Sequence, residues 1–229
     1  MKIGIIVQAR MNSQRFPGKV LYPIAGKSLL QYLIERLERC SVLGTLVVAT
    51  SIDTSDMQIV RFCQERGLEC YQGPLVDVAG RFREVLESYQ FGGFIRISGD
   101  SPLLDQRIVE QAVTTFLASD FDLVTNVFPR TYPLGQSVEV LRSETFRRVY
   151  QQMQDIEDRE HVTQFFYRHP QDFRIHNFTS GGDYSSIRLC VDTEQDIAVL
   201  SKIVARMSKP HWQYHLQEII QIYQEITRG

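Results

Sequence analysis

Short apolar runs alternate with helical patterns through the first half of this chain, and this alternation limits its fold more than any other feature. Runs rich in β-branched residues predict buried strands. They span residues 3–7, 45–50, 68–71, 94–98 and 121–126. Helical stripes of apolar residues lie between them, over residues 27–40, 53–67, 77–89 and 105–116. Strands joined by helices form parallel sheets with both faces covered. We therefore expect a three-layer α/β fold around a mostly parallel, Rossmann-like sheet.

The alternation changes after Asn126, where prolines and a glycine mark a loop. The later patterns predict strands at 136–141, 173–178 and 187–191, and helices at 143–154, 157–168, 193–207 and 213–226. No repeat, low-complexity tract or linker interrupts the chain. One domain over residues 1–229 is therefore the simplest organisation, with an insertion or lid that carries a strand near residues 127–180.

The composition excludes several classes of protein. With 229 residues and 43% hydrophobic content, the chain can bury a sizeable core. A formal charge of −2 argues against a general nucleic-acid binder. The four cysteines form no C-x-x-C pair, which favours free thiols in a reducing compartment over zinc or disulfides. No segment approaches the roughly 20 apolar residues of a membrane helix. We expect a soluble cytoplasmic protein with neither a nucleic-acid nor a membrane partner.

The loop that follows the first strand, residues 8–19, contains three cations, Arg10, Arg15 and Lys19. Ser13 and Gly18 are small enough to let a ligand approach the backbone. Ligands bind at the carboxyl ends of strands in open α/β sheets, and cations with free amides suit a polyphosphate. From charge alone, a solvated basic loop is an equal alternative. The loop matches neither the P-loop pattern nor the dinucleotide pattern G-x-G-x-x-G.

Two aspartates also follow apolar runs. Asp100 lies on a Gly-Asp-x-Pro turn after residues 94–98, and Asp192 ends the run at 187–191. Carboxylates at such an edge can hold Mg²⁺, which prefers one or two carboxylates together with phosphate oxygens and water. Capping of a turn or a helix is the alternative for each, and Asp196 suits a cap better still.

The run A-R-M-N-S-Q-R-F-P-G-K-V-L, residues 9–21, resembles the signature loop of the sugar-activating cytidylyltransferases. It is most similar to the spore-coat polysaccharide branch, which is related to the CMP-KDO and acylneuraminate cytidylyltransferases. The segments I-S-G-D-S-P-L (97–103) and V-D-T-E-Q-D-I (191–197) resemble further motifs of this family. The resemblance spans most of the chain, from residue 3 to about 200.

The resemblance implies a nucleotidyltransferase fold and a Mg²⁺-dependent enzyme. Such an enzyme joins CTP to a small sugar, typically a sugar acid, and makes a CMP-sugar and pyrophosphate for surface polysaccharide. A homodimer is expected by analogy. The residues implied as catalytic are Arg10, Lys19 and Asp100, and those implied to hold the metal are Asp100 and Asp192. The nucleotide-binding residues would be Gln8, Ala9, Arg10, Ser13, Arg15, Lys19, Arg81 and Gly99. For Arg81, an exposed helix arginine is the alternative.

The acceptor site is less well defined by the resemblance. R-E-H-V-T (159–163) and P-L-G-Q-S-V-E-V (133–140) are similar to family segments. The acceptor candidates are Asn126, Glu139, Arg159 and His161. Ser137 stands where the family pattern has aspartate, so acceptor contacts in this chain should differ. A structural role is the alternative for His161.

Three other functions compete with this one. Another nucleoside triphosphate could replace CTP. A glycosyltransferase would carry a D-x-D after a strand, whereas Asp120-Phe121-Asp122 precedes one. A non-catalytic relative would have been free to lose the cations and both carboxylates. No side chain stands out as a general base, and His211 and Trp212 are expected to pack in the core or to contact another subunit rather than to react.

Overall fold

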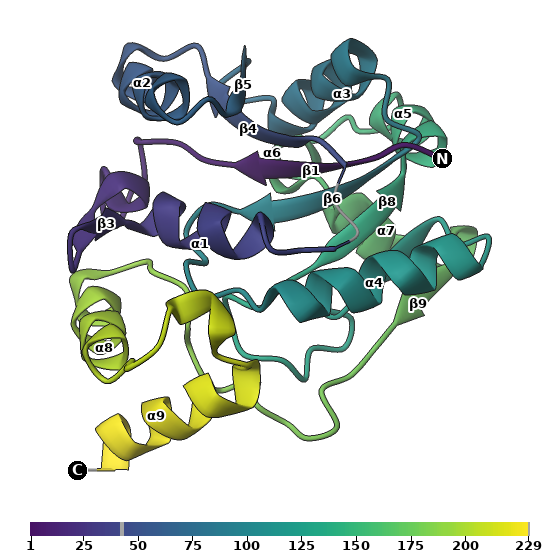
Figure 1. The fold of residues 1–229 in the computed structure, drawn as a ribbon. Coiled ribbons are helices and arrows are strands. Elements are labelled where there is room, and N and C mark those ends of the chain that lie inside the picture. The colour runs from purple at the N-terminus through teal and green to yellow at the C-terminus, as the bar shows by residue number, and fades with distance from the viewer. Residues whose placement is uncertain (42–43, 229) are drawn as a thin grey trace.

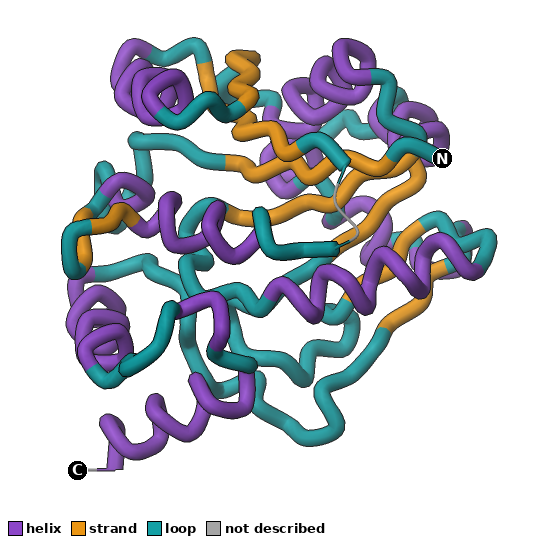
Figure 2. The backbone as a smooth tube through the Cα atoms, viewed as in Figure 1, coloured by secondary structure: helices purple, strands orange, loops and turns teal. Residues whose placement is uncertain are grey.

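A seven-stranded sheet runs through the centre of the computed structural model, which describes residues 1–41 and 44–228 (Figures 1 and 2). In spatial order its strands are β5 (Glu69–Gly73), β4 (Leu46–Ser51), β1 (Ile3–Gln8), β6 (Gly93–Ser98), β8 (Glu139–Arg142), β7 (Leu123–Thr125) and β9 (Ile175–Asn177). Within this sheet of described residues, β8 pairs antiparallel with β6 and β7, and the other pairs are parallel. The predicted α/β fold with a mostly parallel sheet is confirmed.

Helices cover both faces of the sheet (Figure 1). One face packs against α1 (Leu29–Leu37), α2 (Met57–Glu65), α4 (Gln106–Ala118), α8 (Glu194–Ala205) and α9 (Leu216–Arg228). The other packs against α3 (Val78–Tyr89), α5 (Ser143–Tyr150) and α7 (Gln164–Arg168). Side chains alternate between the two faces along each strand, so Ile5 and Val7 join the first core and Ile6 the second. Each fully buried aliphatic or aromatic side chain stabilises the fold by about 1.5–3 kcal/mol.

Two helix starts follow the predicted chemistry. The Thr193 hydroxyl accepts a hydrogen bond from the backbone N–H of Asp196, and the Asp196 carboxylate accepts one from the N–H of Thr193. This reciprocal capping box opens α8 and confirms Asp196 as a cap. Asp105 caps α4 by accepting from the N–H of Arg107.

The strand predicted at residues 187–191 is wrong. Among the described residues, this segment forms a single bridge, between Arg188 and Leu134, and joins no strand of the sheet. Ile187, Leu189 and Val191 are nevertheless buried, because every second side chain faces the core. The alternation of apolar residues in this segment therefore indicated burial of every second side chain, and not hydrogen bonding to a neighbouring strand.

Two helical predictions also need correction. The helix predicted from Lys27 begins at Leu29, because Lys27–Ser28 forms the short strand β3 with β2 (Pro23–Ile24) and Ser28 caps α1. Its predicted end at Cys40 is also too late, because α1 ends at Leu37 and residues 38–39 form a turn. The helix predicted at 157–168 is divided into α6 (Ile156–His161) and α7, because Val162 between them has a φ of +56°.

The predicted insertion, residues 127–180, contributes β8 and β9 to the main sheet, with α5, α6 and α7. Whether part of it closes over a ligand stays a prediction. No helix in the described ranges is both long enough and apolar enough to cross a lipid bilayer.

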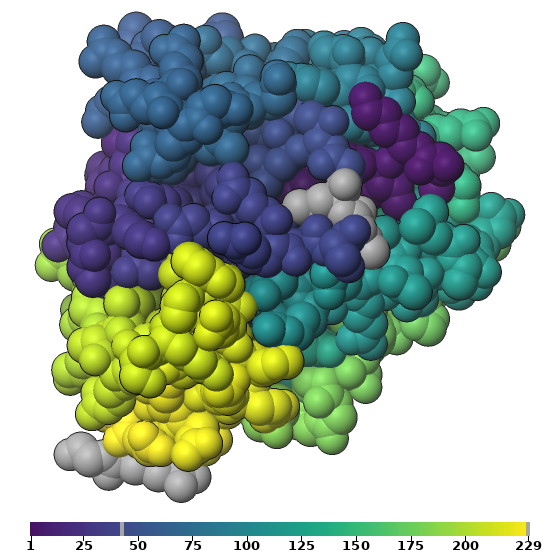
Figure 3. Space-filling model, in the orientation of Figure 1, coloured from purple at the N-terminus to yellow at the C-terminus, as the bar shows by residue number. Residues whose placement is uncertain are grey.

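A buried arginine fastens the C-terminal segment to the core. Figure 3 shows this segment, in yellow, packed against the purple N-terminal part of the chain and teal residues of α4. The Arg36 guanidinium is fully buried and donates hydrogen bonds to the carbonyls of Leu104 (2.7 Å), His211 and Tyr214 (2.9 Å). Burial lowers the pKa of Arg36 to about 10. His211 is itself buried, as predicted, and its ring contacts Glu35.

Candidate active site

A cavity of about 670 Å³ opens where β1 and β6 end side by side. Gln8 ends β1 beside Ser98 at the end of β6, and the N–H of Gly99 donates to the Gln8 carbonyl over 2.8 Å. A Cβ on residue 99 would lie 3.0 Å from that carbonyl oxygen, so glycine permits the close approach. The loop of residues 8–19 and the turn at Asp100 therefore face one another across this edge of the sheet.

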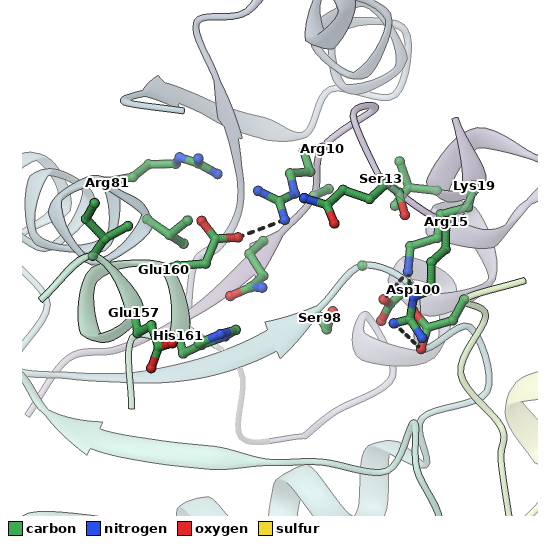
Figure 4. Close-up of a pocket in the computed structure, with 18 residues that line it drawn as sticks. Arg10, Ser13, Arg15, Lys19, Arg81, Ser98, Asp100, Glu157, Glu160 and His161 are labelled. Carbon is green, nitrogen blue, oxygen red and sulfur yellow. Dashed lines mark hydrogen bonds and ion pairs between the residues drawn. The ribbon is translucent and has the colours of Figure 1, made fainter. Parts of the chain in front are cut away.

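All of the predicted nucleotide and metal residues line this cavity together. They are Gln8, Ala9, Arg10, Ser13, Arg15, Lys19, Arg81, Gly99, Asp100 and Asp192, with His161 from the acceptor candidates. Figure 4 shows two ion pairs in this cavity, on opposite sides of Ser98. One joins Arg10 to Glu160 and the other joins Lys19 to Asp100.

Lys19 joins the two predicted metal carboxylates. Its ammonium donates to Asp100 Oδ2 over 2.6 Å, to Asp192 Oδ1 over 2.9 Å and to the Val191 carbonyl over 2.8 Å. Burial opposes the charged form of Lys19, but the two carboxylates outweigh it and raise its pKa. The pKa of Asp192 is lowered, because contacts with Lys19 outweigh the opposing effect of burial. This convergence makes one compact charged centre from segments far apart in the sequence.

Asp192 receives further cations. Arg15 Nη2 lies 3.1 Å and Arg188 Nη1 3.0 Å from its Oδ2 atom. The side chain of Arg15 is 66% exposed, so this contact is easily exchanged for an anionic ligand.

The other side of the cavity is acidic, which sequence reasoning missed. Glu157, Glu160 and His161 of α6 line it, and Glu160 Oε1 lies 2.8 Å from Arg10 Nη2. The Glu160 carboxylate therefore forms an ion pair with Arg10, the cation that was predicted to bind phosphate. The only sequence signal was the position of Glu160 beside two acceptor candidates in the R-E-H-V-T segment.

Arg81 lines the cavity but is not the exposed helix residue of the alternative interpretation. It is 1% exposed, and its guanidinium donates to the carbonyls of Pro74 (2.7 Å) and Leu75 (3.2 Å). Burial lowers its pKa. Arg81 therefore fixes the loop before α3 at the wall of the cavity.

A second cavity of about 270 Å³ adjoins the first, and His161 lines both. In it, Arg96 Nη1 donates to Glu139 Oε2 over 2.6 Å, and the Tyr167 hydroxyl donates to Glu139 Oε1 over 2.5 Å. Burial together with the Glu139 charge raises the pKa of Tyr167 well above its usual value. The next residue after His161, Val162, holds its φ of +56° although it is β-branched and fully buried. Such a strained backbone is typical of functional sites.

Comparison with known proteins places the fold and the first cavity in context. Residues 4–225 match the family model described as cytidylyltransferase. This chain belongs to the cytidylyltransferase family. It is 30% identical, over 85% of its length and 82% of the relative's, to the spore coat polysaccharide biosynthesis protein SpsF of Bacillus subtilis. The family assignment confirms the resemblance seen in the sequence.

Two further similarities support this assignment. The chain is 32% identical to a 3-deoxy-manno-octulosonate cytidylyltransferase of Trichlorobacter lovleyi, over 52% of its own length and 46% of that protein. The solved structure of a cytidylyltransferase from Leptospira borgpetersenii superposes with a TM-score of 0.95 at 25% identity, covering 100% of this chain and 96% of that one.

Two acceptor candidates of this cytidylyltransferase lie outside both cavities. Asn126 is fully buried, and its amide donates to the Gln136 carbonyl and accepts from the Val138 N–H. Arg159 points to the start of α3, where its guanidinium lies 3.3 Å from the Asp77 carboxylate. Both side chains are thus engaged in holding loops, whereas Glu139 and His161 face the second cavity.

The family member has a donor set suited to a hard cation. Asp100 and Asp192 converge on one atom, the Lys19 ammonium nitrogen. The described residues contain no cluster of three or more carboxylate, histidine or cysteine side chains that could enclose a metal. Two carboxylates in an open cavity fit Mg²⁺, which completes its shell with water and phosphate oxygens.

Proposed function

We propose that this protein transfers the cytidylyl group of CTP to a sugar hydroxyl and releases pyrophosphate. The family assignment and the names of the relatives support CTP and a sugar acid, with surface polysaccharide as the destination of the product. The observation that carries the proposal is the convergence of Lys19, Asp100 and Asp192 in a cavity walled by the loop of residues 8–19. We expect a cytoplasmic enzyme, and the homodimer stays a prediction.

The nucleotide would occupy the larger cavity. Arg10, Arg15 and Lys19 line this cavity and would bind the phosphates, with Arg10 exchanging Glu160 for an anionic oxygen. Positioning and charge neutralisation supply most of the catalysis in phosphoryl-type transfers. In the reaction, the acceptor oxygen bonds to the α-phosphorus, the bond from that phosphorus to the bridging oxygen breaks, and Arg10 and Lys19 stabilise the departing pyrophosphate.

Asp100 and Asp192 would hold Mg²⁺. When bound, such an ion neutralises phosphate charge and lowers the pKa of an attacking hydroxyl group. The Lys19 ammonium holds the two carboxylates together, and it would turn toward a phosphate as the nucleotide arrives. The acceptor would enter the second cavity, where Glu139 and His161 are placed to contact its hydroxyl groups.

A thermal-shift panel with CTP, UTP, GTP and ATP, each with and without Mg²⁺, tests the nucleotide. A ligand at 100 times its dissociation constant stabilises the folded state by about 2.7 kcal/mol, which raises the midpoint by about 5 to 10 °C for a chain of this size. We expect a Mg²⁺-dependent shift with CTP. A larger shift with another triphosphate would replace CTP. No shift with any nucleotide would support the non-catalytic alternative.

Pyrophosphate release then tests the reaction itself. We expect release only when CTP, Mg²⁺ and a sugar acid are all present. Asp100→Asn should abolish it without unfolding the protein, because the cavity is open and the substituted side chain has the same shape. Wild-type release by this variant would contradict the role of Asp100.

A further inference from the structure

The second cavity contains two arginines whose charges are balanced differently. The charge of Arg96 is balanced by a carboxylate of the protein itself, because its guanidinium donates a hydrogen bond to Glu139 over 2.6 Å. It also donates to the Thr163 hydroxyl over 3.2 Å and to the Gln8 side chain over 3.0 Å. The second oxygen of Glu139 accepts from the Tyr167 hydroxyl. Arg96 and Glu139 therefore form an ion pair in the wall of the cavity, and the charge of Arg96 is balanced within the protein.

Arg130 lies in the same cavity without such a partner. Its guanidinium is half-buried and donates one side-chain hydrogen bond, from Nη1 to the Ser137 hydroxyl over 3.0 Å. Within the parts of the chain that the structure describes, Arg130 forms no ion pair. The carboxylate that acts on it most strongly is Glu139, which is already engaged by Arg96 and Tyr167. Most of the five N–H donors of this guanidinium are consequently available to a ligand.

The balance of charge in the cavity is therefore positive. A half-buried cation without a counter-ion is unfavourable, and burial lowers the pKa of Arg130. A planar guanidinium pairs with a carboxylate through two parallel hydrogen bonds, a geometry that a lysine cannot reproduce. An anionic group on the acceptor would supply the missing charge.

Ser137 explains why this charge is available. It stands where the family pattern P-x-G-x-D-V-E-V has aspartate, and its hydroxyl is the side-chain partner of Arg130. An aspartate at this position would place a carboxylate at the distance of an ion pair and neutralise Arg130 from within. With serine, the guanidinium stays oriented but charged.

We propose that Arg130 is a specificity-determining residue that binds the carboxylate of the acceptor sugar, and that Ser137 keeps its guanidinium free to do so. The proposal rests on the proposed function, since it assigns the acceptor to the cavity next to the nucleotide. That cavity shares His161 with the nucleotide cavity, so an acceptor held by Arg130 reaches the junction where transfer would occur.

The experiment compares Ser137→Asp with Ser137→Asn, and Arg130→Met with Arg130→Lys. Ser137→Asp adds an internal counter-ion, whereas Ser137→Asn adds similar bulk without charge. Pyrophosphate release is measured with CTP and three kinds of acceptor: 3-deoxy-manno-octulosonate and N-acetylneuraminate as carboxylates, glucose 6-phosphate as a phosphate with a free anomeric hydroxyl, and N-acetylglucosamine as a neutral sugar.

We expect the wild type to use the carboxylates and not the neutral sugar. Ser137→Asp and Arg130→Met should raise the KM for the carboxylate about 10- to 100-fold, as expected for loss of a charged hydrogen-bonded pair. Ser137→Asn should raise it much less than Ser137→Asp, Arg130→Lys should fall between the wild type and Arg130→Met, and the KM for CTP should stay within about twofold in all four.

The outcomes separate this proposal from the proposed function. Equal use of the neutral sugar, or an unchanged carboxylate KM in Ser137→Asp and Arg130→Met, would overturn the role of Arg130 and leave cytidylyl transfer intact. Use of glucose 6-phosphate with the same dependence on Arg130 would keep the anion site and overturn the choice of carboxylate. If no sugar were turned over, calorimetric titration of the two carboxylates into wild type and Ser137→Asp would decide: binding lost in the variant supports the site, and absent or equal binding overturns it.

Discussion

Replacing Lys19 with methionine should damage both stability and activity, because it removes the ammonium that joins Asp100 and Asp192. Removal of one partner from a buried ion pair costs about 3–5 kcal/mol. Here Lys19 is 10% exposed and the two carboxylates are 21% and 19% exposed, and Arg15 and Arg188 still contact Asp192. Allowing for this partial screening, we expect the free energy of unfolding to fall by about 2–3 kcal/mol.

The assay is urea denaturation of the wild type and Lys19→Met at pH 7, with pyrophosphate release measured on the same samples. We expect release to fall by about 100-fold or more, the usual effect of removing one group that stabilises developing charge. A second measurement repeats the urea denaturation of both proteins with Mg²⁺ added and no nucleotide. Because the variant has two carboxylates without their shared ammonium, added Mg²⁺ should stabilise it more than it stabilises the wild type.

The matched control is Lys27→Met. Lys27 also forms a short ion pair, 2.5 Å from Glu35, but its side chain is 34% exposed and does not line either cavity. This variant should lose about 1 kcal/mol or less and keep full activity. The reasoning would be refuted if the two lysine variants lost the same stability, or if Lys19→Met released pyrophosphate at the wild-type rate.

Three further predictions concern other parts of the molecule. Glu160→Gln should lower the KM for CTP about two- to fivefold, because a partly exposed carboxylate no longer competes with CTP for Arg10. An unchanged or higher KM in steady-state kinetics would contradict this prediction. Burial lowers the pKa of His211 below its ordinary value of 6.5, so the unfolded state takes up a proton at a higher pH than the folded state does. The free energy of unfolding should therefore keep its full value above about pH 6.5 and fall as the pH drops toward 5. In urea titrations, His211→Asn should show a weaker dependence of this free energy on pH. Gly135→Ala should lower the free energy of unfolding by about 2–4 kcal/mol, because φ is +92° and the new Cβ would lie 2.6 Å from the Cys190 nitrogen. Gly181→Ala, at φ +79° with open space around it, should lower it by about 1 kcal/mol in the same denaturation assay.

The parallel core of the fold could be predicted from local patterns alone. Buried strands such as β1 are runs of β-branched residues, and the helix caps Asp105 and Thr193 carry their own chemistry in a few adjacent residues. The segment at 187–191 could not be classified in this way. Its alternation is real and its side chains are buried, but strand pairing depends on a partner elsewhere in the chain.

The cation loop and the two carboxylates were also predictable, since each directly follows an apolar run. Their meeting on one lysine was not, because Lys19 and Asp192 are 173 residues apart and only the folded chain brings them together. Arg130 was missed for a similar reason, because it precedes an ordinary proline and glycine loop and only the fold places it in one cavity with Arg96 of β6. Asn126 illustrates the opposite error, since a polar residue at a strand end can be fully occupied by backbone groups.

The guanidinium of Arg36 has a practical consequence for anyone who wishes to shorten or fuse this protein. Two of its three carbonyl acceptors, on His211 and Tyr214, belong to the last twenty residues of the sequence. A chain cut before them would leave a positive charge in the interior with two of its three carbonyl acceptors gone, so a loss of yield on trimming should not be taken as a sign that the tail takes part in catalysis. Tags and partner domains are better joined beyond α9 than before it.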